Sequence, residues 1–190
     1  MKISNARERF LNLEEVCQLL EEVQSNKTIH QFVRIALLTG ARLESILHIQ
    51  KKDIHLDQSR IVLNDFKSGT TYGGFIDEQL REELRVSLIG LKANDYYIGR
   101  ASTVLSFRII QTSLKPILDK LFNVGLKKDD VKNRVVIHTL RHTFASQLAI
   151  KGVPIFNIQK LMNHSNIEMT MRYAKLAPDY GIDIIKDLYH

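Results

Sequence analysis

The sequence predicts a mainly α domain with a small antiparallel β-sheet, an α+β fold, and three observations lead to this class. Apolar residues recur at helical spacing along most of the 190 residues. The spacing changes to that of strands only between residues 53 and 77. No repeat, low-complexity stretch or Gly/Ser/Pro-rich linker divides the chain, so we expect one domain over residues 1–190.

Local signals predict the first three helices. Asn12 and Glu15 have the spacing of a capping box, so a helix is expected to begin near residue 13. A second helix is expected over about residues 29–38, ended by Gly40, and a third helix follows Arg42. The first helix carries the apolar stripe Val16, Leu19, Leu20 and Val23, and the third carries Leu43, Ile46, Leu47 and Ile49.

A β-hairpin is predicted in the middle of the chain. Two segments with strand-like composition, residues 61–63 and 72–76, flank the polar residues 67–70. We therefore expect Lys67 near the tip of a hairpin.

The second half of the chain is predicted to be helical. Helical patterns lie at about residues 77–90, 102–111 and 112–123. A further helix is expected over residues 138–148, with Gly152 in the usual C-terminal position. A basic loop precedes that helix and contains Lys127, Lys128, Lys132 and Arg134.

Three shorter signals follow. Pro154 is expected to begin another helix. Ser165 and Glu168 have the spacing of a second capping box, so a short helix is expected to lead to Tyr173. Pro178 precedes a last amphipathic segment, whose apolar side is formed by Ile182, Ile185, Leu188 and Tyr189.

Composition excludes several classes of protein. With 27 Lys and Arg against 21 Asp and Glu, the formal charge is +6, which favours a polyanionic partner such as nucleic acid. No apolar run approaches the roughly 20 residues that cross a bilayer, and the N-terminus lacks a secretory signal. Cys17 is the only cysteine, which excludes an intrachain disulfide and a cysteine zinc cluster. We expect a cytoplasmic protein with no membrane partner.

The predicted helix at residues 138–148 carries candidate chemistry. His138 and Arg141 are three apart, so an imidazole and a guanidinium lie on one face, where both can meet one phosphate. Taken alone, such a pair is more often a helix cap and a surface ion pair. His138 and His142 have the spacing of a helical metal-ligand pair, but the cationic Arg141 lies between them and a third ligand is missing. We therefore expect no metal site.

Tyr173, Arg42 and Lys67 are ordinary residues when each is considered separately. Tyr173 is one of six tyrosines, and a phenol with a pKa near 10 needs cationic neighbours or a base to act as a nucleophile. Arg42 is compatible with a simple contact at the end of the preceding helix, and Lys67 with a solvated turn lysine. Their order and context along the chain change this interpretation.

Four segments together resemble the tyrosine recombinase (phage integrase) family, in a Xer-like form. The resemblance spans about residues 10–180. Its most specific parts are the sequence HTLRHTFA and the later His-Ser and Thr-Met-Arg-Tyr-Ala pattern, in the order and at the separation typical of the family. The four segments are residues 39–42, Lys67 in the hairpin, residues 138–145 and residues 161–174.

The resemblance implies the family's catalytic-domain fold and an enzyme that cuts and rejoins DNA through a 3′-phosphotyrosine link. Tyr173 would attack the scissile phosphate, and Arg42 and Arg141 would donate forked hydrogen bonds to its non-bridging oxygens. Lys67 would be the general acid that protonates the departing 5′ oxygen. The programme served would be integration, excision, inversion or chromosome-dimer resolution.

The histidines receive supporting roles from the same resemblance. His138 would contribute proton transfer or a phosphate contact, and His164 would donate a hydrogen bond to the phosphate. His142 matches a position that is more often supporting than catalytic. The residues expected to contact DNA are Arg42, Lys67, Arg141, His142 and His164.

The sequence departs from the family pattern at two positions. The family usually has Glu three residues after the first arginine, where this chain has Ser45 preceded by Glu44, so the support of Arg42 is expected to be rearranged. The family commonly has Gly before the histidine at position 164, where this chain has Asn163. Asn tolerates a left-handed backbone, so we expect the turn to survive.

The resemblance also implies partners and assembly. Double-stranded DNA is the expected partner, with a homotetramer on paired sites, no cofactor, no metal and no small-molecule substrate. Residues 179–190 resemble a tail helix that is exchanged between subunits, although packing on its own domain is equally compatible with the pattern. We expect the family's N-terminal core-binding domain to be absent, which is compatible with a catalytic fragment of a longer recombinase and with a compact member of the kind that inverts short DNA segments.

Two other functions remain open from the sequence. A DNA-binding fragment or module with the same fold but no turnover of its own is one alternative. A type IB topoisomerase, which shares the tyrosine chemistry, is the other.

Overall fold

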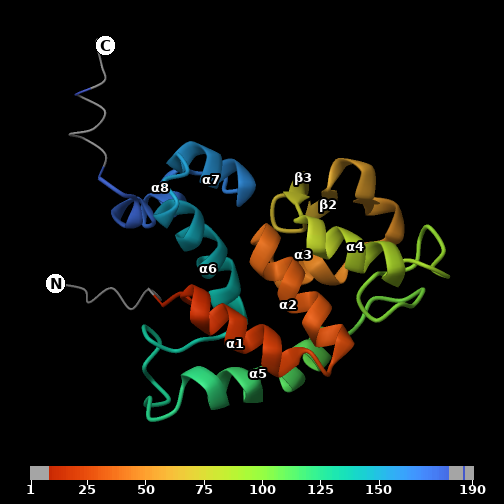
Figure 1. Cartoon of the computed structure of the whole chain (residues 1–190), viewed down its shortest axis with the longest axis horizontal. Coiled ribbons are helices and arrows are strands. Elements are labelled where there is room, and N and C mark those ends of the chain that lie inside the picture. Colours follow the sequence, from red (N-terminus) through yellow and green to blue (C-terminus); the bar gives the residue numbers. More distant parts are fainter. Residues whose placement is uncertain (1–8, 180–185, 187–190) are drawn as a thin grey trace.

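The computed structural model describes residues 9–179 and residue 186, and it confirms a mainly helical fold with a small antiparallel sheet (Figure 1). The predicted tail helix over residues 179–190 lies outside the described residues, apart from Asp179 and Lys186. Within the described part of the chain, no helix is both long and apolar enough to cross a membrane. The helices are α1 Leu13–Val23, α2 Lys27–Thr39, α3 Leu43–Leu47, α4 Glu78–Ser87, α5 Phe107–Phe122, α6 Ile137–Ile150, α7 Ile155–Leu161 and α8 Glu168–Met171, and the strands are β1 Ile54–His55, β2 Arg60–Asp65 and β3 Thr70–Phe75.

Several predicted helix ends are confirmed. The Asn12 side chain accepts a hydrogen bond from the Glu15 amide at 2.8 Å, and the Glu15 carboxylate accepts one from the Asn12 amide at 2.9 Å, which is the predicted capping box. Gly40 ends α2 with a left-handed φ of 62°, and Gly152 follows α6 with a φ of 77°. Pro154 caps the N-terminus of α7.

Two local predictions are wrong. The patterns at residues 102–111 and 112–123 form one helix, α5, which begins at Phe107 and contains Pro116 in its interior. The buried stripe Ile110, Leu114 and Leu118 runs past Pro116, so packing keeps the helix continuous where the proline removes one backbone hydrogen bond. The prediction of a capping box at Ser165 is also wrong. The side chain of Asn166, rather than that of Ser165, accepts a hydrogen bond from the Glu168 amide at 3.0 Å.

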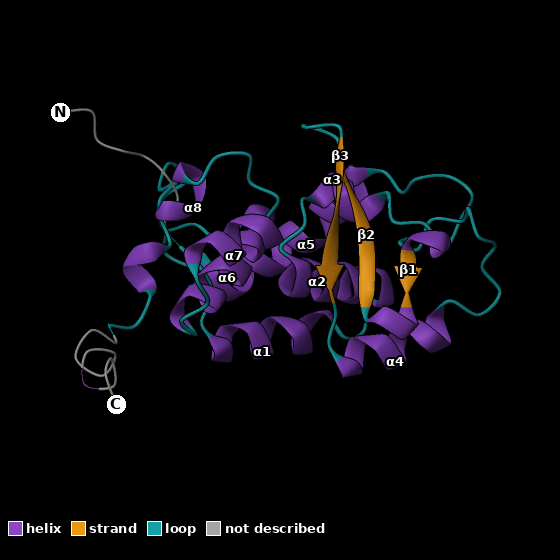
Figure 2. Ribbon diagram, turned by 90° about the horizontal axis from the view of Figure 1, so that it is seen from above, coloured by secondary structure: helices purple, strands orange, loops and turns teal. Residues whose placement is uncertain are grey.

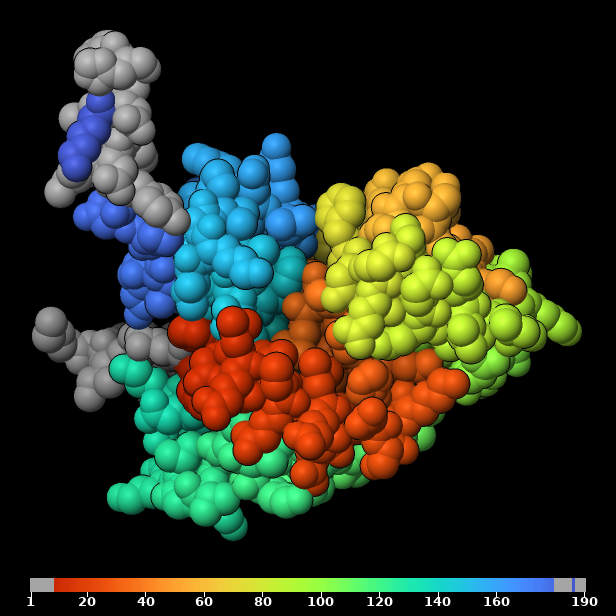
Figure 3. Space-filling view, viewed as in Figure 1, coloured from red at the N-terminus to blue at the C-terminus, as the bar shows by residue number. Residues whose placement is uncertain are grey.

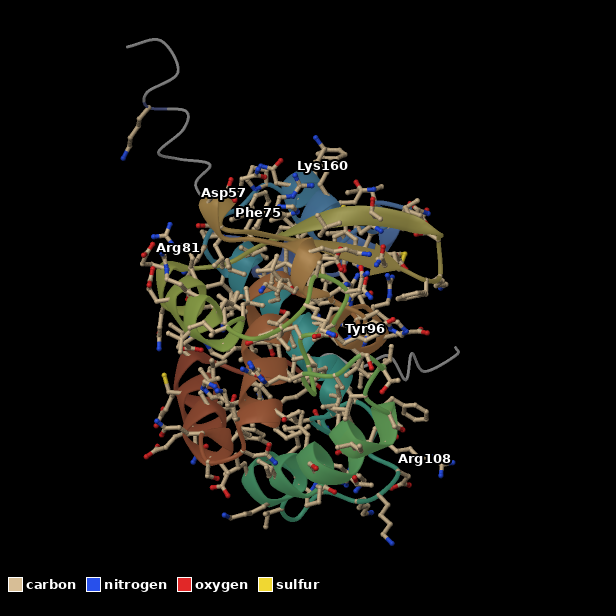
Figure 4. The ribbon with its side chains drawn as sticks, turned by 90° about the vertical axis from the view of Figure 1, so that its right-hand side faces the viewer. Asp57, Phe75, Arg81, Tyr96, Arg108 and Lys160 are labelled. Atoms are coloured by element: carbon tan, nitrogen blue, oxygen red, sulfur yellow. The ribbon has the colours of Figure 1, made fainter. Side chains whose placement is uncertain are left out.

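The sheet has the order β1-β2-β3, and all its pairs are antiparallel (Figure 2). In the predicted hairpin Arg60 pairs with Phe75 at one end and Asp65 pairs with Thr70 at the other. Lys67 therefore lies in the connecting turn, as predicted. Figure 4 shows Phe75 at the end of the sheet away from this turn, with Lys160 of α7 above the sheet.

Helix α2 lies at the centre of the molecule. It contacts α1, α3, α5, α6 and strand β3, and buried residues occur around most of its circumference. A helix that is covered on most sides is fixed by packing rather than by its own propensity. Helix α2 ends at Gly40, two residues before Arg42. The backbone position of Arg42 is therefore fixed by a rigid helix.

Helix α6 joins two hydrophobic cores. Leu140 belongs to the main core, which also contains α1, α2, α5 and the sheet. Ala145 and Ala149 belong to a second, smaller core with Ile158 of α7, Met162 and Tyr173. Arg141 and His142 therefore lie on α6 between the two cores, and Tyr173 is placed by the second core.

Candidate active site

A cavity of about 870 Å³ lies beside α6, α8 and the hairpin turn. In the space-filling view a notch separates the blue C-terminal helices from the yellow residues of the hairpin (Figure 3). The hairpin turn that borders the cavity points to the far side of this view, at the upper edge of Figure 2. The structure brings all the sequence-predicted site residues to this one cavity. They are Arg42, Lys67, His138, Arg141, His142, His164 and Tyr173.

Arg141 is held by the backbone of two distant segments. Its side chain is buried, with 4% of the residue exposed. One guanidinium nitrogen donates to the carbonyl of Gly40 at 2.6 Å, and the other donates to the carbonyl of Met162. Burial and then the charge of Arg42 lower the pKa of Arg141, but a guanidinium remains protonated in proteins. The result is a fixed positive charge at the cavity wall.

Arg42 receives its support from a residue that the sequence analysis missed. Arg42 is the N-cap of α3, and its Nη1 donates a hydrogen bond to the Asp65 carboxylate at 2.6 Å. Ser45 is buried and uncharged, and Glu44 is exposed, so the support of Arg42 is rearranged as expected. The signal for Asp65 was weak, because a single polar residue at the inward-facing end of a strand is common.

Lys67 is exposed in the turn between β2 and β3. Its backbone amide donates to the Asp65 carboxylate at 3.1 Å, so the start of the turn is tied to the strand end. Beside it, the Phe66 ring packs against His48 with 4.4 Å between ring centroids. The side chain of Lys67 thus extends from a turn whose base is anchored at two points.

The turn before His164 has the expected conformation. Asn163 adopts a left-handed φ of 49°. His164 Nδ1 lies 2.8 Å from the Thr170 hydroxyl. In the tautomer in which Nδ1 accepts from that hydroxyl, Nε2 carries the proton and can donate to a ligand. Burial, followed by the charges of Arg141 and Arg42, lowers the pKa of His164 to about 4. His164 is therefore neutral at pH 7.

Tyr173 is almost fully buried and is hydrogen-bonded to His142. Only 4% of Tyr173 is exposed, and its hydroxyl lies 2.7 Å from His142 Nδ1. The ring of His138 stands edge-on to the ring of His142, with 4.8 Å between centroids. Burial raises the pKa of Tyr173, while the charges of Arg172 and Arg141 act in the opposite direction. The imidazole that bonds the tyrosine is thus His142.

Two further residues near the site were not singled out from the sequence. The Arg172 guanidinium lies 5.8 Å from the centroid of the Tyr173 ring. Tyr72 is a buried residue of β3, and burial raises its pKa while the charges of Arg141 and Arg42 lower it. Arg172 could have been noticed because it is basic and directly precedes Tyr173 in the sequence. For Tyr72 the sequence indicates only a strand residue that faces the core.

No metal-binding cluster is present among residues 9–179 and residue 186, where no three His, Cys, Asp or Glu side chains converge. The positive charge of the cavity comes instead from arginine and lysine side chains. An arrangement of two guanidiniums, three imidazoles and an ammonium around a phenol suits a phosphate oxyanion.

Comparison with known proteins agrees with this chemistry. The sequence profile described as the phage integrase family matches residues 9–179. The tyrosine recombinase XerA of Saccharolobus solfataricus is 28% identical over 168 residues, which cover 84% of this chain and 53% of the relative. The chain thus spans about half the length of this relative.

Solved structures share the fold. The catalytic domain of bacteriophage HP1 integrase matches with a TM-score of 0.70 and 26% identity over 94% of each chain. The Tn1549 transposon integrase, solved in complex with a circular intermediate DNA, matches with a TM-score of 0.76 and 16% identity over 99% of this chain and 68% of that chain. At 16% identity the second likeness shows the fold alone.

Proposed function

The chain belongs to the phage integrase family, and from this premise we propose that it is the catalytic domain of a tyrosine-type site-specific DNA recombinase. Such an enzyme cuts and rejoins DNA strands through a 3′-phosphotyrosine intermediate. The observation that carries the proposal is the convergence on one cavity of a tyrosine, two arginines and a lysine from four separate segments.

In the proposed cleavage step the Tyr173 oxygen attacks the scissile phosphorus. The bond between phosphorus and the 5′ oxygen breaks, and a 3′-phosphotyrosine forms while the other strand end leaves as a 5′ alcohol. The Tyr173 proton goes to His142, because Nδ1 of that ring is 2.7 Å from the hydroxyl. Attack by a 5′ hydroxyl on the phosphotyrosine reverses these changes without ATP.

The phosphate is stabilised by fixed donors. Arg42 and Arg141 donate to its non-bridging oxygens, where negative charge gathers in the transition state. The neutral His164 donates from Nε2 in the tautomer in which its Nδ1 accepts from the Thr170 hydroxyl. Proton transfer and a phosphate contact were the two roles expected for His138. We assign it the phosphate contact, because His142, which lies beside it on α6, is the proton acceptor next to Tyr173.

Lys67 protonates the departing 5′ oxygen. An ammonium on an exposed turn has the reach that a general acid needs as the leaving group moves away. We propose that the arginines and this lysine supply the positive charge, and that the reaction needs neither metal nor cofactor.

We propose double-stranded DNA as the partner, with further contacts from His142. The formal charge of +6 supports binding to a polyanion. Each tyrosine cuts one strand, so exchange between two duplexes uses four copies, which favours a homotetramer on paired sites. A DNA-acting enzyme of this family fits a cytoplasmic location.

The proposal is tested by covalent capture from a library of nicked suicide duplexes with randomised sequence. Cleavage of a suicide duplex releases a short fragment that begins with the new 5′ hydroxyl and ends at the nick. Because this fragment diffuses away, the protein stays joined to the DNA, and the adduct survives denaturation in detergent. We expect an adduct with the native chain and with Tyr96→Phe, a matched tyrosine outside the cavity lining, and none with Tyr173→Phe.

Each outcome has a defined meaning. An adduct that persists in Tyr173→Phe refutes the assignment of the nucleophile. Loss of the adduct in EDTA refutes the metal-free mechanism. DNA binding without any adduct in the native chain indicates a binding module rather than an enzyme.

A further inference from the structure

A single buried carboxylate connects three parts of the cavity wall. Asp65 is the last residue of β2, and only 3% of it is exposed. Its Oδ2 accepts from Arg42 Nη1 at 2.6 Å and from Asn163 Nδ2 at 3.0 Å. Its Oδ1 accepts from the backbone amide of Lys67 at 3.1 Å. These donors come from the start of α3, the turn after α7 and the hairpin turn.

Each of these donors leads to a group that the proposed reaction uses. Arg42 is itself a phosphate ligand. The amide of Lys67 fixes the backbone that carries the general acid. Asn163 immediately precedes His164, and its side chain also donates to the Thr70 hydroxyl at 3.2 Å, which ties the same turn to β3.

The carboxylate is charged in this environment. Burial raises the pKa of Asp65, but the hydrogen bond from the Lys67 amide and the charge of Arg42 outweigh it, and the pKa lies below its ordinary value. An ionised carboxylate accepts hydrogen bonds at both oxygens, whereas a carboxamide has one accepting oxygen and a nitrogen that donates. A carboxamide at this position would turn a donor toward another donor.

We infer that Asp65 is a positioning residue of the proposed reaction, and the inference rests on the proposed function. Its carboxylate sets the Arg42 guanidinium, the Lys67 backbone and the turn before His164 in one arrangement around the scissile phosphate. Ser45 places no charge next to Arg42, so the carboxylate that orients this arginine comes from the sheet.

The experiment compares Asp65→Asn with a matched control, Asp119→Asn. Asp119 of α5 also accepts from an arginine and an asparagine, Arg134 and Asn123, each at 2.7 Å. Both variants and the native chain are tested on two suicide duplexes of the same sequence. One duplex has the normal phosphate at the scissile position, and the other has a methylphosphonate there. The methylphosphonate lacks the charge of one non-bridging oxygen, so cleavage depends less on an oriented arginine.

On the phosphate duplex we expect Asp65→Asn to form the adduct about 30-fold more slowly, as loss of a charge-assisted hydrogen bond to a reacting group implies. On the methylphosphonate duplex the difference from the native chain should shrink to about threefold. Asp119→Asn should match the native chain on both duplexes. A general loss of folded protein would slow both reactions equally and would not produce this split.

A second variant keeps the test decisive if Asp65→Asn folds poorly. Asp65→Glu retains the charge with one extra methylene, and we expect its phosphate rate to recover to within about fivefold of the native rate. Equal slowing on the two duplexes, or a glutamate variant as slow as the asparagine variant, would overturn the role of Asp65 alone. Absence of any adduct in the native chain would overturn the proposed function and this role with it.

Discussion

The substitution Gly40→Ala tests the link between the end of α2 and the position of Arg141. Gly40 is buried and has a left-handed φ of 62°. A Cβ atom built on it would overlap a ring carbon of Phe144. The Gly40 carbonyl also accepts the 2.6 Å hydrogen bond from Arg141. Alanine therefore disturbs both the packing of α6 and the support of the arginine.

The expected magnitude has two parts. A non-glycine residue in the left-handed conformation costs about 1–2 kcal/mol. Forcing the Phe144 ring to move adds about 1–3 kcal/mol, as for other overpacked sites. The sum is about 2–5 kcal/mol, which lowers the melting temperature of a chain of this size by roughly 10 °C.

Gly90→Ala is the matched control. Gly90 has a left-handed φ of 82°, but among the described residues no heavy atom lies within 4 Å of the position its Cβ would take. This variant carries only the backbone cost, so its melting temperature should fall by about 3 °C. Calorimetry measures both shifts, and adduct formation at 20 °C measures the effect on the site.

Equal melting shifts in the two variants would show that the Phe144 contact contributes nothing, and the packing argument would fail. An unchanged adduct rate in Gly40→Ala, measured where the variant is folded, would show that the added methyl group does not displace the carbonyl that holds Arg141, and the link between the end of α2 and the arginine would fail.

Three further predictions concern stability. Thr143→Val should lower the free energy of unfolding in urea by about 1–3 kcal/mol, because it leaves the buried Leu11 amide without its 2.9 Å acceptor, whereas the exposed Thr112→Val should change it by less than about 0.5 kcal/mol. Asn163→Ala should melt lower than Asn163→Gly, since both lose the amide contacts but only alanine is strained at a φ of 49°. Folding lowers the pKa of His164 from 6.5 to about 4, so its contribution to the free energy of unfolding is present above pH 6.5 and is lost as the pH falls toward 4. Between pH 7 and pH 5, urea titrations should therefore show a smaller loss of unfolding free energy in His164→Gln than in the native chain.

Much of the fold could be predicted because its signals are local. The capping box at Asn12, the hairpin around Lys67 and the left-handed Asn163 each depend on residues a few positions apart. The error at α5 lies at the division between residues 111 and 112, because the buried stripe Ile110, Leu114 and Leu118 continues across that position. Propensity is a weak guide where tertiary packing covers a helix face.

The supports of the site could not be predicted because they are not local. The donors of Arg141 reach carbonyls 101 and 21 positions away, and the Arg42 guanidinium reaches a carboxylate 23 positions away. Hydrophobic periodicity carries no information about such pairs. Motif resemblance selected the residues that gather at the cavity, whereas the pairing of Tyr173 with His142 depends on how α6 packs against the second core.

The crowding of cations at the cavity has a consequence for binding. The charges of Arg141, Arg42 and His138 all contribute to the low pKa of His164, after burial. A DNA phosphate brings a negative charge among these groups and raises that pKa, so binding takes up a proton. Affinity for DNA should therefore rise as the pH falls from 6.5 toward 4, and the rise should be smaller in His164→Gln when both are measured by fluorescence anisotropy at fixed salt. Equal pH dependence in the two proteins would mean that His164 does not face the phosphate.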